Sequence, residues 1–149
     1  MRAYPPKSFK LQWSDDDINW TDAGSWSNLT WVLGETKLFR LPDVVETPVD
    51  QPYLYWRLNF AASMGVPTGK TYWFNISEIE MRATQGGTDQ CENGTSDAHN
   101  YYSSSYGPGK AFDNSSSSFW GSWPTPDPGP PYWIKYNFTS AVYVREVVI

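Results

Sequence analysis

The sequence predicts an all-β protein, a sandwich or jelly roll built from many short strands. Aromatic residues make up 17% of the 149-residue chain, and such side chains favour the half-buried surfaces of sheets. Twelve Pro and eleven Gly residues supply turns and interrupt any long helix. Apolar and polar residues alternate in several segments, whereas a 3.6-residue apolar period is missing throughout. The length suits a single domain over residues 1–149.

Four segments have the pattern of strands that lay one face on a core. In residues 9–13, Phe, Leu and Trp alternate with Lys and Gln. Residues 53–60 and 134–139 alternate in the same way, with the apolar positions two apart. Residues 142–149 form a β-branched run that contains an Arg and a Glu, and we interpret the run as one further strand.

Turn-rich segments separate these predicted strands. Residues 14–20 form a polar, hairpin-like tip whose Asp side chains can cap backbone amides. Residues 64–69 are a Gly- and Pro-containing loop, and residues 85–109 are long, polar and rich in Ser and Tyr. Residues 121–131 contain five Pro, so we expect no strand pairing there.

Charge and cysteine content exclude several classes of function. The net charge is −5, and the eleven Lys and Arg residues are scattered, so the basic footprint of a nucleic-acid binder is missing. The longest apolar runs span a few residues, which predicts no membrane insertion. Cys91 is the single cysteine, and we expect a small buried or loop residue. The first six residues carry no apolar leader segment, so we do not expect the secretory route.

Short motifs in the two parts of the chain resemble those of one known domain family. Residues 1–83 contain Pro-Lys-Ser-Phe at 6–9, Ser-Asp-Asp-Asp-Ile-Asn-Trp at 14–20, Tyr-Leu-Tyr-Trp-Arg-Leu at 53–58 and Ile-Ser-Glu-Ile-Glu-Met at 76–81. Residues 86–149 contain Gly-Gly-Thr at 86–88, Lys-Ala-Phe-Asp at 110–113, Trp120 and Tyr-Trp-Ile-Lys-Tyr-Asn-Phe at 132–138. Together they resemble the discoidin, or coagulation factor 5/8 type C, domain, which implies a galactose-binding-like jelly-roll β-sandwich.

The two halves stand in reversed order relative to that family. Residues 1–83 resemble its C-terminal half and residues 86–149 its N-terminal half. The chain is therefore expected to be a circular permutant, or to exchange strands with neighbouring copies, or to be a stretch of a tandem array. A closed monomer is favoured over swapping because its partner strand is always local. Closure requires the two chain ends to be neighbours in space.

The resemblance also implies a structural Ca²⁺ in the loop that follows residue 110. Calcium prefers several hard oxygen ligands in flexible geometry. The implied ligands are the carboxylates of Asp113 and Glu78, the carbonyl of Lys110, and carbonyl or hydroxyl oxygens of Ser115 and Ser118. Asn114 stands where the family usually has Gly, and Ser115 where it often has Asn or Asp. The alternative is that Asp113 only caps a turn in a serine-rich loop.

Loop aromatics are the candidate ligand-binding residues, because sugars stack their C–H faces on exposed rings. The family brings two loops to one end of the sandwich, and the rings there would be Tyr101, Tyr102, Tyr106, Trp123 and Tyr132. Side chains that could hydrogen-bond sugar hydroxyls are His99, Asn100 and Asp127. The alternative is that most of these aromatics pack into the core. Trp20, Trp120 and Trp133 match structural positions of the family, and we assign them to packing.

These observations predict a non-catalytic carbohydrate-binding or adhesion module. His99 lies near Asp97 and Ser103 in the sequence, but neither a nucleophile elbow nor an oxyanion-hole motif accompanies them, so we expect no enzyme. By analogy with discoidin-like modules of phage tail fibres, we expect a virion-surface or extracellular protein that binds glycans. Two alternatives remain: a decoration or cement subunit that contacts other virion proteins or its own copies, and a carbohydrate-binding module of a larger enzyme.

Overall fold

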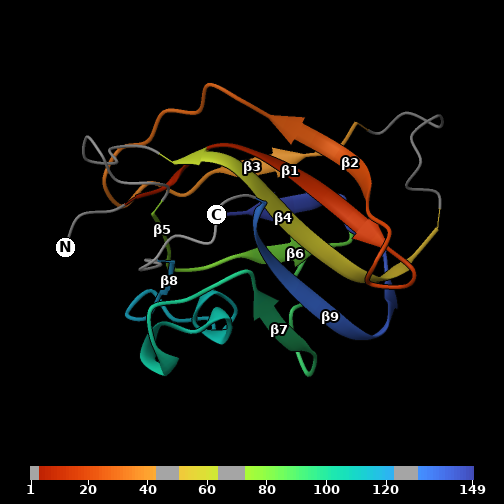
Figure 1. The fold of residues 1–149 in the computed structure, drawn as a ribbon. Coiled ribbons are helices and arrows are strands. Elements are labelled where there is room, and N and C mark those ends of the chain that lie inside the picture. The colour runs from red at the N-terminus through yellow and green to blue at the C-terminus, as the bar shows by residue number, and fades with distance from the viewer. Residues whose placement is uncertain (1–3, 43–50, 64–72, 123–130) are drawn as a thin grey trace.

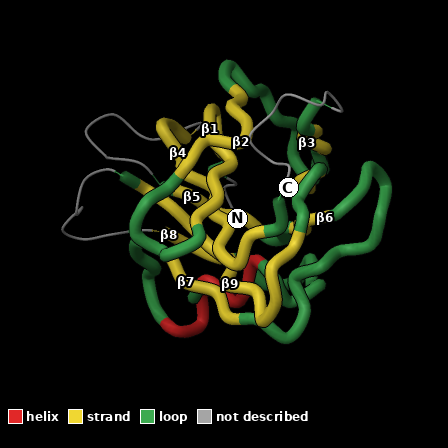
Figure 2. Tube along the Cα trace, turned by 90° about the vertical axis from the view of Figure 1, so that its right-hand side faces the viewer, coloured by secondary structure: helices red, strands yellow, loops and turns green. Residues whose placement is uncertain are grey.

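A computed structural model of the chain describes residues 4–42, 51–63, 73–122 and 131–149 (Figure 1). Within these ranges the structure is mostly β, which confirms the predicted all-β class. The strands are β1 (Pro6–Ser14), β2 (Thr21–Trp26), β3 (Leu38–Arg40), β4 (Tyr53–Ser63), β5 (Phe74–Ile76), β6 (Glu80–Arg82), β7 (Thr95–Ala98), β8 (Trp120–Ser122), β9 (Tyr132–Val142) and β10 (Glu146–Val148). Two short 3₁₀ helices, η1 (Ser104–Tyr106) and η2 (Pro108–Ala111), contact β8, and η2 also contacts β7 (the helices are red in Figure 2). No helix in these ranges is long and apolar enough to span a membrane.

The strands form antiparallel sheets whose order mixes the two parts of the chain. The larger sheet has the order β2-β1-β4-β9-β7, so β4 from the first part pairs with β9 from the second. A three-stranded sheet has the order β3-β10-β6, which again places a late strand between two early ones. A short two-stranded sheet joins β5 to β8.

The core lies between the five-stranded and three-stranded sheets. Leu11, Leu58 and Ile134 face one another in register on β1, β4 and β9, and each is fully buried. The opposing sheet contributes a buried row that includes Phe39, whose ring meets that of Phe9 edge-on at a centroid distance of 4.8 Å. The two-residue alternation in the sequence therefore places every second side chain of the central strands in the core.

The end of the chain is anchored, and it lies close to the start of the first strand. Ile149 exchanges two backbone hydrogen bonds with Lys37, of 2.8 and 3.0 Å. Pro5 lines the same pocket as Val148 and Ile149. The bridge between the two parts of the chain turns at Gly86, whose φ of 69° lies in the left-handed region that glycine adopts at low cost.

Three element predictions need correction. No strand pairing was expected in residues 121–131, but Gly121 and Ser122 belong to β8 and pair with Asn75 and Phe74 of β5, because they precede the first proline of that segment. Residues 142–149 are not one strand, because β9 ends at Val142 and β10 begins at Glu146 after the chain crosses to the other sheet. Backbone hydrogen bonds of Arg145 with Arg82 and Leu41 hold that crossing. The segment 85–109 is predicted as loop, yet it contains β7, η1 and the start of η2. Among the described strands β7 pairs only with β9, and it exposes polar side chains, so it carries little of the apolar alternation that marks a strand.

Candidate functional site

The loop from Gly107 to Ser118 is held against the closing part of the first half of the chain. The Ile79 N–H donates a 2.7 Å hydrogen bond to the carbonyl of Ala111, which places Glu78 beside the loop. The Ser115 N–H donates to Glu78 Oε2 at 3.0 Å. Asn114 has a φ of 55°, a left-handed conformation that Asn tolerates better than most residues. Gly and Asn both adopt this conformation, so Asn114 fits here as well as a Gly would.

Asp113 is bound within the same loop. The Ser118 hydroxyl lies 2.8 and 2.7 Å from the two carboxylate oxygens of Asp113, and it also lies 3.3 Å from the Ser115 carbonyl. The Lys110 ammonium is 3.5 Å from Asp113. The structure therefore brings together all five residues that were predicted as calcium ligands, and these contacts also satisfy the turn-capping alternative for Asp113.

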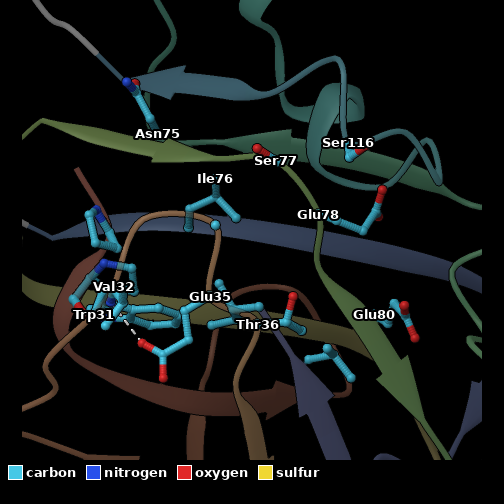
Figure 3. A pocket seen from close by; sticks show the side chains of 15 residues that line it. Trp31, Val32, Glu35, Thr36, Asn75, Ile76, Ser77, Glu78, Glu80 and Ser116 are labelled. Atoms are coloured by element: carbon cyan, nitrogen blue, oxygen red, sulfur yellow. Dashed lines mark hydrogen bonds between the residues drawn. The ribbon is translucent and has the colours of Figure 1, made fainter. Parts of the chain in front are cut away.

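Glu78 is the unusual group in this cluster. Its Oε1 is buried and has no hydrogen-bond partner among the described residues. Burial raises the pKa of Glu78 to about 7; hydrogen bonds from Ser115 and Ile79 oppose this, and the nearby charges of Asp113 and Asp89 add to it. Figure 3 shows Glu78 and Ser116 at one side of a pocket of about 350 Å³, with Trp31 and Glu35 across from them. An unpartnered, buried carboxylate oxygen next to a second carboxylate is a reason to expect a cation nearby.

The donor set fits Ca²⁺ in chemistry. The described residues contain no group of three or more His, Cys, Asp or Glu side chains placed to share a metal ion. A cation in this loop would therefore combine the carboxylates of Glu78 and Asp113 with neutral oxygens from Ser115, Ser118 and Lys110. A site made only of hard oxygen donors suits calcium better than zinc or copper.

Two tyrosines stand out at the neighbouring loop before η1. Tyr101 and Tyr102 are 49% and 60% exposed. The Tyr102 N–H donates to the carbonyl of Gly121 at 2.9 Å, which ties the loop to β8. The Tyr102 ring lies 5.9 Å from that of Tyr106, which in turn lies 4.9 Å from that of Phe119. The Tyr102 ring thus rests on a packed aromatic layer, and Tyr101 precedes it directly in the chain.

Other predicted ligand-binding residues take structural positions. Tyr132 is a correction: it is 1% exposed, because it lies in phase with the core residue Ile134 on β9. Asn100 fixes β8, since its side-chain oxygen accepts from the Ser122 hydroxyl and its carbonyl accepts from the Trp120 indole N–H at 3.0 Å. Trp123 and Asp127 lie outside the described residues.

His99 joins this loop end to the five-stranded sheet. Its backbone N–H donates to the Trp133 carbonyl at 2.9 Å. The centroid of its ring lies 6.0 Å from that of Tyr132 and 6.3 Å from that of Trp133. His99 Nε2 is buried and has no hydrogen-bond partner among the described residues. The backbone hydrogen bond extends the β7–β9 pairing up to the candidate tyrosines.

The tryptophans that were assigned to packing divide into two groups. Trp120 is buried and its ring is parallel to that of Phe74, with an interplanar angle of 7°. Trp133 and Trp20 are only partly buried and lie on the outer face of the five-stranded sheet, where Trp20 covers the Arg57 guanidinium at 4.1 Å. The signal for Trp133 was present in the sequence, because it is out of phase with Ile134, Tyr136 and Phe138.

Comparisons of the chain with protein-family models, with curated proteins and with solved structures find no significant match.

Proposed function

We propose that this chain is a non-catalytic carbohydrate-binding module that uses the exposed pair Tyr101 and Tyr102. The observation that carries the proposal is that two adjacent rings are exposed while the backbone beneath them is fixed by the Tyr102–Gly121 hydrogen bond. A ring held in place loses little conformational entropy when a sugar stacks on it. Stacking on such rings, with hydrogen bonds setting the orientation, is how sugars are recognised in other sites.

The proposal includes the jelly-roll topology of discoidin-like domains with the two halves in permuted order. The motifs in the sequence support it, and so does the pairing of β4 with β9 across the two parts of the chain. The shared pocket of Pro5 and Ile149 also supports it, because a permutant must keep its new ends near each other.

A structural Ca²⁺ in the Asp113 loop is part of the same proposal. When bound, the ion would supply positive charge that neutralises the two neighbouring carboxylates. Glu78 and Asp113 would hold it, and Asn114 would keep the loop in its left-handed turn. In this view the ion orders the loop end, and the sugar is bound by the tyrosines.

A glycan array tests the proposed function directly. Wild-type protein is expected to bind at least one glycan, and Tyr101→Ala and Tyr102→Ala are each expected to weaken that binding about tenfold, equivalent to about 1.4 kcal/mol. The matched control is Tyr143→Ala, because Tyr143 is 40% exposed and follows the far end of β9. Absence of glycan binding by the wild type, or equal loss in the control, would refute the proposal.

A second candidate function, a decoration or cement subunit of a virion, has one observation in its favour. Val32, Leu33 and Leu38 are 74%, 83% and 50% exposed and are close in sequence. Apolar side chains gathered at a surface favour protein–protein contact with other virion proteins or further copies. Concentration-dependent self-association that Leu33→Ser abolishes, together with an empty glycan array, would favour this function over the first.

A further inference from the structure

The outward-facing side chains of the five-stranded sheet, termed here the outer face, include two rows that cross neighbouring strands. The first row is Ser25, Lys10, Asn59 and Trp133, which are register partners on β2, β1, β4 and β9. The second row is Asp22, Gln12, Arg57, Lys135 and Asp97, which continues onto β7. Neither row contains an aliphatic side chain. Contact with water would by itself account for that polarity.

The second row is a hydrogen-bonded network that holds the first row in place. Gln12 donates to Asp22 at 2.6 Å and accepts from Arg57 at 2.7 Å and from Asn59 at 3.3 Å. Lys10 pairs with Asp22, so both rows share one carboxylate. Side chains fixed in this way are preorganised hydrogen-bonding groups for a ligand.

The charges of the outer face balance, which bears on the kind of ligand it would accept. Its cations are Lys10, Arg57 and Lys135. Lys10 pairs with Asp22, and Lys135 lies 2.5 Å from Asp17 and 3.9 Å from Asp97. Arg57 is also within the influence of Asp17 and Asp22. Three cations facing three carboxylates leave no excess of either sign, so a neutral, hydroxyl-rich ligand suits this face better than a polyanion.

The first row borders a hollow and ends at an aromatic ring. A surface pocket of about 360 Å³ lies over β1, β2 and β4, and its polar lining includes Ser8, Lys10, Ser25 and Asn59. Trp133 follows Asn59 in the row and is partly exposed. Its ring is positioned by His99, which directly follows β7, and by the Lys135 ammonium, which lies on the same strand and 5.5 Å from the ring centroid.

We propose that the outer face is a second binding site, for a neutral oligosaccharide chain. Trp133 would provide the stacking surface, and Asn59, Lys10 and Ser25 the hydrogen bonds. From Trp133 to Ser25 the row spans three inter-strand spacings, about 14 Å, which is the reach of a short chain rather than one sugar ring. His99 connects Trp133 to the loop of Tyr101 and Tyr102. The inference therefore rests on the proposed function and extends it: the ligand is a chain that continues from the loop end onto the sheet.

The test compares glycan-chain length with outer-face variants. The probes are neutral oligosaccharides of increasing length, built on the sugar that the wild type binds best on the array, measured by titration calorimetry. Wild-type affinity is expected to increase with chain length. Trp133→Ala is expected to remove that increase, with at least a tenfold loss for the longest chain, and Asn59→Ala to weaken it several-fold. Asn137→Ala is the control for Asn59→Ala, because Asn137 is also an asparagine and lies on the same face of β9 as Trp133, two residues beyond Lys135.

The outcomes separate this inference from the proposed function. If Tyr101→Ala loses binding while Trp133→Ala behaves like the wild type, the second site is overturned and the first is left. Binding restricted to acidic glycans has the same consequence. Absence of any glycan binding by the wild type overturns both. If Trp133→Ala fails to fold, the indole N–H resonance of Trp133 in the wild type, assigned with Trp133→Phe, decides. A shift at saturation with the longest chain supports the site, and an unmoved resonance refutes it.

Discussion

Glu146 is a fully buried carboxylate, and residues from distant parts of the chain satisfy it. Its oxygens accept from Arg40 at 2.7 Å and from Arg82 and the Gly86 N–H at 3.0 Å each. Burial alone would raise the pKa of Glu146, but these three hydrogen bonds together lower it below its usual range. The group therefore links β3, β6, β10 and the bridge between the two halves.

The substitution Glu146→Gln is expected to destabilise the protein by about 3 kcal/mol at neutral pH, because it leaves buried donors poorly paired. A folded pKa below the unfolded value means that the wild-type carboxylate stabilises the fold above the unfolded pKa. That contribution is lost as the pH falls through the folded pKa, so the difference between the two proteins should shrink in acid. Urea unfolding across acid to neutral pH measures it. Glu92→Gln, at an exposed position, serves as the control and should stay within about 0.5 kcal/mol.

Glu78 should show the opposite pH dependence in calcium-free protein. Its folded pKa of about 7 exceeds the usual 4.5, so its contribution is fully present below the unfolded pKa and is lost as the pH rises to about 7. Because the group is partly exposed to solvent, we expect a loss of only about 1 kcal/mol. Urea unfolding of chelator-treated protein checks this, and Glu78→Gln should remove the dependence.

Calcium should act through the same residue. Above pH 7, millimolar Ca²⁺ is expected to raise the midpoint of thermal unfolding of the wild type, since binding to the folded state alone stabilises it. The increase should be absent in Glu78→Gln and in Asp113→Asn. An equal increase in all three proteins would locate the ion elsewhere, and no increase in the wild type would leave Asp113 as a turn cap only.

At the scale of elements, the loop between β1 and β2 folds back over the outer face. The Asp16 carboxylate accepts from the backbone N–H groups of Ile18 and Asn19 at 2.9 and 2.7 Å, which closes the tip as the Asp-rich sequence predicted. Asp17 then reaches Lys135 on β9, which is separated from β1 by β4. The hairpin tip is thus part of the sheet surface.

We expect Asp17→Asn to cost about 1–2 kcal/mol of unfolding free energy, because Lys135 is 8% exposed and would lose its nearest carboxylate. Asn preserves the left-handed backbone of position 17, whose φ is 61°. Asp15→Asn in the same loop is the matched control, since Asp15 is exposed. Guanidinium unfolding monitored by circular dichroism measures both, and equal values for the two variants would contradict the assigned ion pair.

For the whole molecule, the pairing of early with late strands predicts a closed monomer. The described strands of a single chain form all three sheets, so light scattering should give a mass near 17.0 kDa. A chain that joins Ile149 to Met1 through a short Gly/Ser linker and opens between Gln85 and Gly86 should fold with the same circular dichroism spectrum. The control opens the same linked chain between Leu58 and Asn59, inside β4, and should not fold. Failure of the first variant, or a dimer mass for the natural chain, would contradict permuted closure.

Much of the strand content could be predicted because a two-residue alternation is a local property. The spacing of Phe9 and Leu11, or of Ile134 and Tyr136, places both residues of each pair on the same face of a strand, whatever the partner strand is. The polar edge strand β7 and the break after Val142 could not be predicted in this way, because pairing and sheet crossing leave no local apolar pattern. The cluster of Asp113 with Glu78 came from family resemblance, and the structure places the two together.

The sequence by itself determined the β class, the capped turn at Asp16 and the low basic charge. These features depend on composition or on residues that are close together along the chain. The tertiary structure alone decided that Trp133 lies beside Asn59 of a neighbouring strand, and that Glu146 meets Arg40 from 106 positions away. The physical reason is that burial and charge pairing depend on which distant strands become neighbours. Such contacts are fixed by the packing of whole sheets against each other.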